Sequence, residues 1–101
     1  MSNTEKDNEF YEMADAFIAL ANKQADKAGM GKVSATFLYA AARYNTYVTA
    51  SESSSANDLA TGKEASFGFF VAEYKKMLEE HFADYYENFD KYIKSKNNTI
   101  N

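Results

Sequence analysis

Apolar residues recur every three or four positions along most of this chain, and no proline interrupts them. Of the 101 residues, 46% are hydrophobic and none is proline. This spacing places apolar side chains on one face of an α-helix, and proline is the residue that helix interiors tolerate least. The pattern therefore predicts an all-α fold. Phenylalanine and tyrosine make up 16% of the chain, so they must supply most of the buried volume.

Two helices are predicted in the first half of the chain. The first spans residues 8–28, with Asn8, or Thr4 with Asp7, as the N-terminal cap and Gly29 at its end. The second spans residues 32–50. It is apolar on two sides, which is typical of a central helix packed by neighbours on both.

A third helix is predicted to begin between residues 57 and 66, after a serine-rich loop at residues 51–58. Its apolar stripe continues to Ile93, which would make one helix about 40 Å long. Such a helix either overhangs and pairs with another copy, or breaks. The capping-box spacing of Asp84 and Glu87 favours a break or bend near Ala83, followed by a short fourth helix ending near residue 94.

These elements predict a three- to four-helix up-down bundle with a long C-terminal helix. One hundred and one residues correspond to a single domain, for which we expect an ordered core at about residues 8–94 and flexible tails.

The composition argues against several functions. The net charge is −4 and the lysines do not cluster, so we expect no binding to nucleic acid. No apolar run is long enough to span a membrane, and the N-terminus does not resemble a leader peptide, so we expect no membrane association. The absence of cysteine excludes disulfides and thiolate metal sites. A bacterial cytoplasmic protein fits these features.

Residues suited to catalysis are scarce. His81 is the only histidine, and Leu78 stands where a Glu-x-x-His metal motif would need glutamate. No serine lies in a nucleophile elbow, and the glycines form no phosphate-binding loop. We therefore expect no catalytic residue, no metal and no cofactor, and a protein that is not an enzyme.

Arg43 is the strongest candidate for a binding residue. Tyr39 lies four residues before it and Tyr47 four residues after it, so the three share one line along the second helix. The arginine could cover apolar surface and pair with a neighbouring carboxylate, which is a structural role. Alternatively, it could bind a carboxylate or phosphate ligand in a tyrosine-lined pocket, with His81 contributing, and the protein would then be a small-ligand binder or a minor enzyme. Asn45, between the two apolar faces, is expected to fix helix register.

The aromatic residues predict an interface. Phe69 and Tyr86 lie off the stripe of the third helix, beside Phe70 and Tyr85, and a small domain cannot easily hide them. A homodimer through this helix, with Phe69, Tyr74, Tyr85 and Tyr86 as interface residues, would cover them. Residues 79–90 hold five carboxylates and no lysine or arginine, so a basic protein partner is a further hypothesis.

Three strings resemble a small proteobacterial family of domains of unknown function, the family numbered 3144. They are "ADAFIALAN" at residues 14–22, "VSATFLYAAARYN" at residues 33–45 and "YENFDKY" at residues 86–92. The resemblance covers most of residues 10–92. It implies a compact helical domain and assigns no activity, substrate or cofactor.

Overall fold

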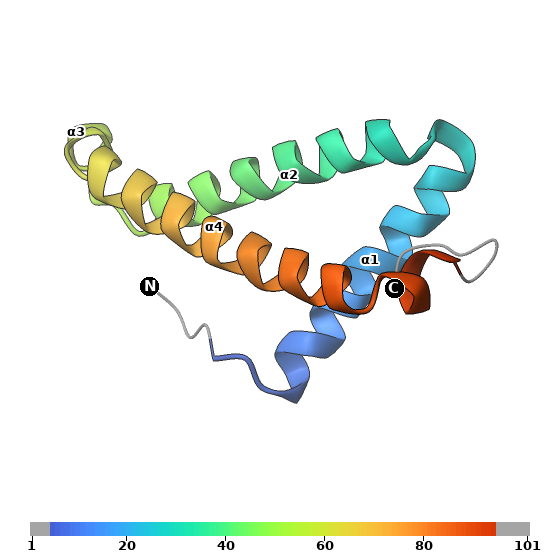
Figure 1. The fold of residues 1–101 in the computed structure, drawn as a ribbon. Coiled ribbons are helices and arrows are strands. Elements are labelled where there is room, and N and C mark those ends of the chain that lie inside the picture. Colours follow the sequence, from blue (N-terminus) through green and yellow to red (C-terminus); the bar gives the residue numbers. More distant parts are fainter. Residues whose placement is uncertain (1–4, 95–101) are drawn as a thin grey trace. The chain divides into compact units, whose positions relative to one another are not determined.

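The computed structural model describes residues 5–94, and every regular element within them is a helix. In chain order these are α1 (Asn8–Ala28), α2 (Met30–Ser51), α3 (Ala56–Thr61), α4 (Lys63–Glu87) and the π-helical segment η1 (Asp90–Lys94) (Figure 1). The all-α class and the long C-terminal helix are confirmed. The predicted flexible tails lie largely outside the described residues.

The chain divides within α2, between Ala40 and Ala41, into two parts that are described separately. In the first part, α1 has the bounds that the sequence predicts. Asp7 is its N-terminal cap, and the carboxylate accepts a hydrogen bond from the Phe10 amide at 3.0 Å. The least exposed apolar side chains from the middle of α1 to the start of α2 are half-buried Ile18, Ala21 and Ala25 and buried Val33. Apart from half-buried Phe10, burial in the first part is therefore confined to the second half of α1 and the first turn of α2.

The second part contains the end of α2 and all that follows it. The serine-rich segment is shorter than predicted, because Ser55 caps a further short helix, α3, by accepting a hydrogen bond from the Asp58 amide. In return, an Asp58 carboxylate oxygen accepts from the Ser54 amide at 2.9 Å. This reciprocal capping explains why six residues of an otherwise loop-like sequence are helical.

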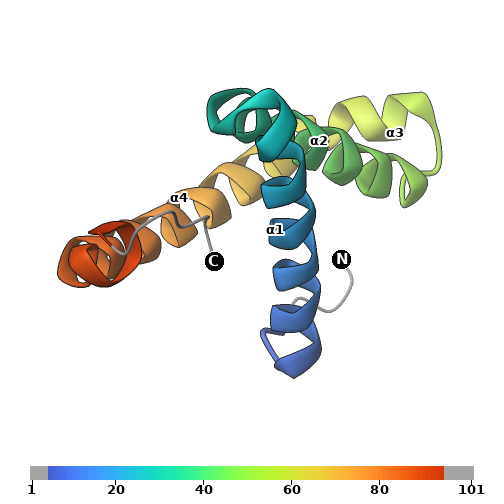
Figure 2. The same ribbon diagram turned by 90° about the vertical axis from the view of Figure 1, so that its right-hand side faces the viewer.

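The predicted break near Ala83 is wrong. α4 runs without interruption from Lys63 to Glu87, and the chain leaves the α-helix at Asn88 (Figure 2). Asp84 does not cap a new helix. Instead, its main-chain oxygen accepts a hydrogen bond from the Asn88 amide at 2.9 Å, which ends α4. The terminal segment is π-helical and spans Asp90–Lys94.

Few hydrophobic side chains are removed from water. Within residues 5–94, Val33 is the only hydrophobic residue that is buried, with 8% of its surface exposed. Large apolar side chains on α1, α2 and α4 stay open to solvent, among them Phe17 at 58% and Phe82 at 72% exposed. None of the helices within the described residues is long and apolar enough to cross a membrane.

The turn between α1 and α2 provides a test of this architecture. Gly29 has φ +91° and ψ 151°, a backbone conformation that side chains with a Cβ rarely adopt. We expect Gly29→Ala to lower the free energy of unfolding by about 1–3 kcal/mol in urea denaturation. Gly68 lies inside α4, with no atom within 4 Å of an added Cβ. Gly68→Ala should therefore raise the free energy of unfolding by about 1 kcal/mol. Equal effects of the two substitutions would contradict the assigned turn.

Candidate functional site

Tyr39, Arg43 and Tyr47 follow one another at intervals of four residues along α2, as predicted. The side chains of Tyr39 and Tyr47 are 67% and 66% exposed. The ring of Tyr47 lies beside that of Tyr44, with 6.2 Å between their centroids, a pair that spacing alone did not single out. The binding role of Arg43 stays a prediction.

His81 lies on a different helix, α4, and its side chain is exposed. Among residues 5–94, no three histidine, aspartate or glutamate side chains gather closely enough to hold a metal ion. A contribution of His81 to ligand binding stays a prediction.

The four predicted interface residues all lie on α4, and they differ in exposure. Phe69, Tyr74 and Tyr86 are 43%, 48% and 87% exposed, and Phe69 meets Phe70 edge to face at 5.3 Å. Tyr85 is half-buried because it stacks on Tyr92, with 4.2 Å between the ring centroids. Three of the four therefore offer open aromatic surface.

The Asp84 carboxylate, near the end of α4, accepts two side-chain hydrogen bonds, whereas the sequence predicted that Asp84 caps a new helix. One carboxylate oxygen accepts a hydrogen bond from the side-chain amide of Asn88, and the other accepts one from the Tyr92 hydroxyl, both at 2.8 Å. The Asn88 side chain also donates to the Asp84 main-chain oxygen at 3.1 Å. We call Asp84, Tyr85, Asn88 and Tyr92 the C-terminal hook, because they fold η1 back onto α4.

Spacing did contain a signal for this hook. Asn88 is four residues after Asp84 and Tyr92 eight, so a helix-like path brings all three to one side. The spacing of Asp84 and Glu87 also fits a capping box, and the prediction therefore assigned Asp84 to a helix start instead of to hydrogen bonds with Asn88 and Tyr92. The hydrogen bonds of the hook connect two segments of the chain, α4 and η1, which is a structural task.

The hook raises the pKa of Tyr92 above its ordinary value of 10.0, chiefly because the phenol donates a hydrogen bond to the Asp84 carboxylate. Ionised Tyr92 would lose that bond and face a like charge. The neutral phenol therefore stabilises the hook at pH values below the ordinary tyrosine pKa, and this contribution is lost as the pH rises through the elevated one.

The elements and contacts define a small all-helical protein whose best-formed side-chain cluster is structural and whose aromatic residues are largely on the surface. Its family can be stated directly. The family model described as "Protein of unknown function (DUF3144)" matches residues 10–86, and the chain belongs to this family. The first two of the three strings fall within the matched range, whereas "YENFDKY" extends beyond it. Neither the curated proteins nor the solved structures yield a match.

The elevated pKa of Tyr92 can be tested by spectrophotometric titration of the eight tyrosines. We expect Tyr92→Phe to remove the part of the titration curve that lies above the ordinary tyrosine pKa. Tyr86→Phe is the matched control, because it removes a phenol that is 87% exposed and lies outside the hook, so it should leave that part of the curve in place. Indistinguishable titration curves for the two variants would contradict the hydrogen bond to Asp84.

Proposed function

We propose that this protein is a non-enzymatic, self-associating interaction module. The observation that supports this proposal is the open apolar surface of the helices. Phe17, Tyr44 and Phe67, on three different helices, are each more than half exposed. Large apolar side chains that stay exposed on a small domain are typical of surfaces that contact other proteins.

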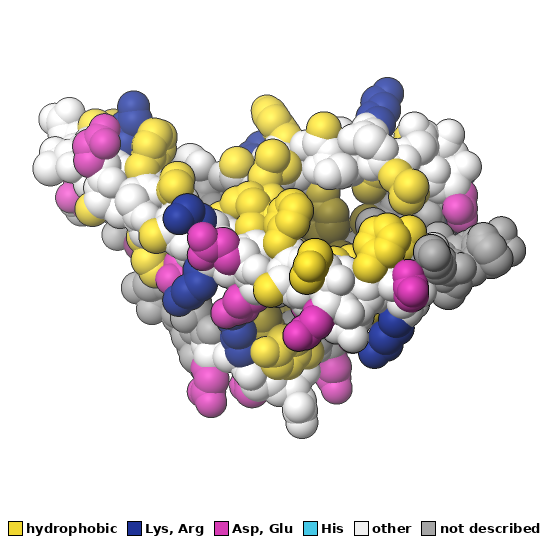
Figure 3. All heavy atoms as spheres, in the orientation of Figure 1, with side chains coloured by type: hydrophobic (Ala, Val, Ile, Leu, Met, Phe, Trp, Pro, Cys, Tyr) yellow, Lys and Arg dark blue, Asp and Glu magenta, His cyan; other side chains and the backbone are white. Residues whose placement is uncertain are grey.

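Hydrophobic side chains lie open along α4 between acidic and basic ones (Figure 3). An interface core that is aromatic with a charged rim is a common arrangement in protein complexes. The charged residues around the aromatic ones are also paired on the same helix. Lys75 contacts Glu79, and Lys76 contacts Glu73, both at 3.4 Å. Pairs as exposed as these contribute little to stability, so they fit a solvated rim.

Self-association is favoured over capture of a small ligand because the exposed residues extend over several helices. A ligand site concentrates its contacts in one concave place, whereas an apolar face spread along a helix suits another helix. The proposed location is the bacterial cytoplasm, on the evidence of the acidic, cysteine-free composition.

Light scattering over a range of protein concentrations tests the proposal. We expect the mass to rise from that of one chain, 11.4 kDa, towards at least twice that value in the micromolar range. Addition of a non-specific apolar dye should give less fluorescence per chain as the mass rises, because association covers the aromatic surface. A mass of one chain at high micromolar concentration would overturn the proposal.

A further inference from the structure

We infer that residues 88–94 are a conformational switch with two states. In one state they form the C-terminal hook with the end of α4, and in the other they continue α4 as a straight α-helix. The hydrogen bonds to Asp84 select the first state. The inference does not depend on self-association, because the contacts that carry it lie within residues 84–92.

The sequence after α4 is compatible with a continued α-helix. No glycine or proline lies between Gly68 and residue 94, so this part of the chain lacks the residues that most strongly disfavour helix. Its apolar and aromatic residues keep helical intervals of four, three and one, which place them on one face. These are Tyr85, Phe89, Tyr92 and Ile93. The apolar pattern alone therefore predicts an α4 that extends to residue 93.

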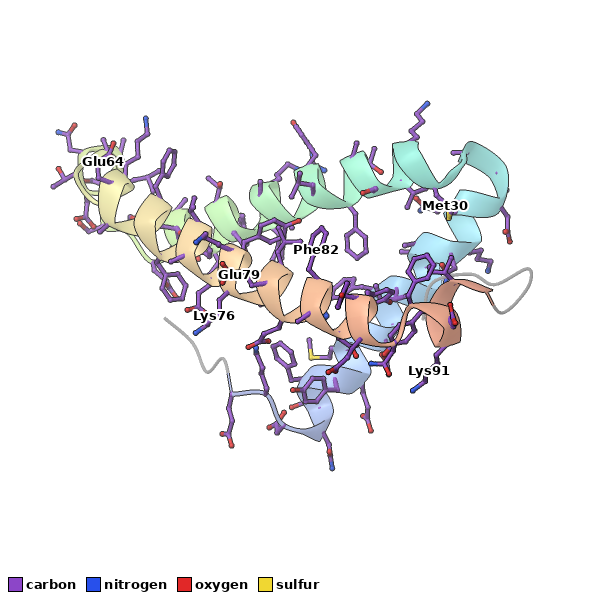
Figure 4. The ribbon with its side chains drawn as sticks, in the orientation of Figure 1. Met30, Glu64, Lys76, Glu79, Phe82 and Lys91 are labelled. Carbon is purple, nitrogen blue, oxygen red and sulfur yellow. The ribbon has the colours of Figure 1, made fainter. Side chains whose placement is uncertain are left out.

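An ion pair also favours the continued helix. Glu87 would lie one turn before Lys91, and a glutamate four residues before a lysine is the favoured order for a pair on a helix surface. In the hook, Lys91 extends into solvent from the segment beyond α4 (Figure 4). Its ammonium lies 5.6 Å from the centre of the Tyr92 ring.

Two contacts of the hook cannot form in a straight α-helix. Residues 85 and 92 would lie about 10.5 Å apart along the axis of such a helix, and residues 84 and 92 about 12 Å apart. In the hook, the ring centroids of Tyr85 and Tyr92 are 4.2 Å apart, and the Tyr92 hydroxyl is 2.8 Å from an Asp84 carboxylate oxygen. The hook and the continued helix therefore exclude each other.

The two states differ chiefly at one residue of the main chain. Asn88 has φ −115° and ψ 32°, whereas an α-helix has values of about −63° and −42°. The segment that follows, η1, is π-helical, a geometry that is rare in proteins. The bond from the Asn88 side chain to Asp84 spans four residues and fits either state. The Tyr92 hydroxyl is therefore the hydrogen-bond donor that distinguishes the hook from the continued helix.

The switch sets the length of the apolar stripe on α4. In the hook, the Tyr92 ring covers one face of the Tyr85 ring. In the continued helix, α4 would be about 10 Å longer, and Phe89 and Ile93, which are 50% and 51% exposed, would extend the stripe. A partner that binds only the longer helix would shift residues 88–94 into that state.

Backbone chemical shifts from nuclear magnetic resonance test the switch residue by residue. We expect the wild-type chain to show α-helical shifts up to residue 87 and an interruption at Asn88. Asp84→Ala removes the acceptor of both side-chain bonds, so its α-helical shifts should continue through residue 93 and the Overhauser contacts between the Tyr85 and Tyr92 rings should be lost. Tyr92→Phe removes only the hydroxyl and should raise the ratio of continued helix to hook at least about tenfold.

Glu80→Ala is the matched control, because it removes an exposed carboxylate one turn before Asp84 and leaves the bonds of the hook in place. It should change neither the interruption at Asn88 nor the ring contacts. Random-coil shifts after residue 87 in Asp84→Ala would overturn the inference, because the hook would then be the only folded state of this segment. An interruption that persists in Asp84→Ala, an uninterrupted wild-type helix or an equal effect of Glu80→Ala would also overturn it. Helical shifts over residues 63–83 establish that α4 is intact in each variant.

Discussion

An amphipathic helix in water is stable only when something covers its apolar face, and this requirement dominates the structure. Isolated helices of about twenty residues gain little from propensity alone, because nucleation is costly and side-chain pairs add only tenths of a kcal/mol. The ion pairs of Lys75 and Lys76 on α4 are of this weak, exposed kind. Val33 is the only buried hydrophobic residue among those described, so the apolar face of α4 stays largely open to solvent.

Local chemistry accounts for where the helices begin and end. The Asp7 carboxylate accepts from the Phe10 amide, and Ser55 does the same for α3, so each cap satisfies a main-chain donor that the helix itself leaves unpaired. Gly29 separates α1 from α2 by a positive φ that other residues would resist. These interactions span three or four residues. They fix the lengths of the helices but contribute no force that would bring two helices together.

The elements that sequence reasoning predicted are those whose signals are local. The bounds of α1 follow from the apolar stripe and Gly29, and α2 begins two residues earlier and ends one residue later than expected. The helix α3 was missed because a run of serines resembles a loop, whereas the Ser55 hydroxyl accepts from the Asp58 amide and the Asp58 carboxylate accepts from the Ser54 amide. The break after α4 was misplaced because the Asp84–Glu87 spacing fits an N-terminal cap, whereas Asp84 bonds forward to Asn88 and Tyr92. For the candidate binding residues, periodicity placed Tyr39, Arg43 and Tyr47 on one line of α2, but the neighbour that Tyr47 meets, Tyr44, depends on side-chain rotamers.

The C-terminal hook acts over a longer distance along the chain than the helix caps do. The Tyr85 ring is held by stacking on Tyr92, whose hydroxyl donates a hydrogen bond to Asp84, eight residues earlier. These contacts fold η1 onto α4 and confine one aromatic ring. They do not reach the apolar side chains earlier along α4, where Phe67 and Val71 stay 57% and 66% exposed. The hook therefore fixes the end of α4 without covering its apolar face.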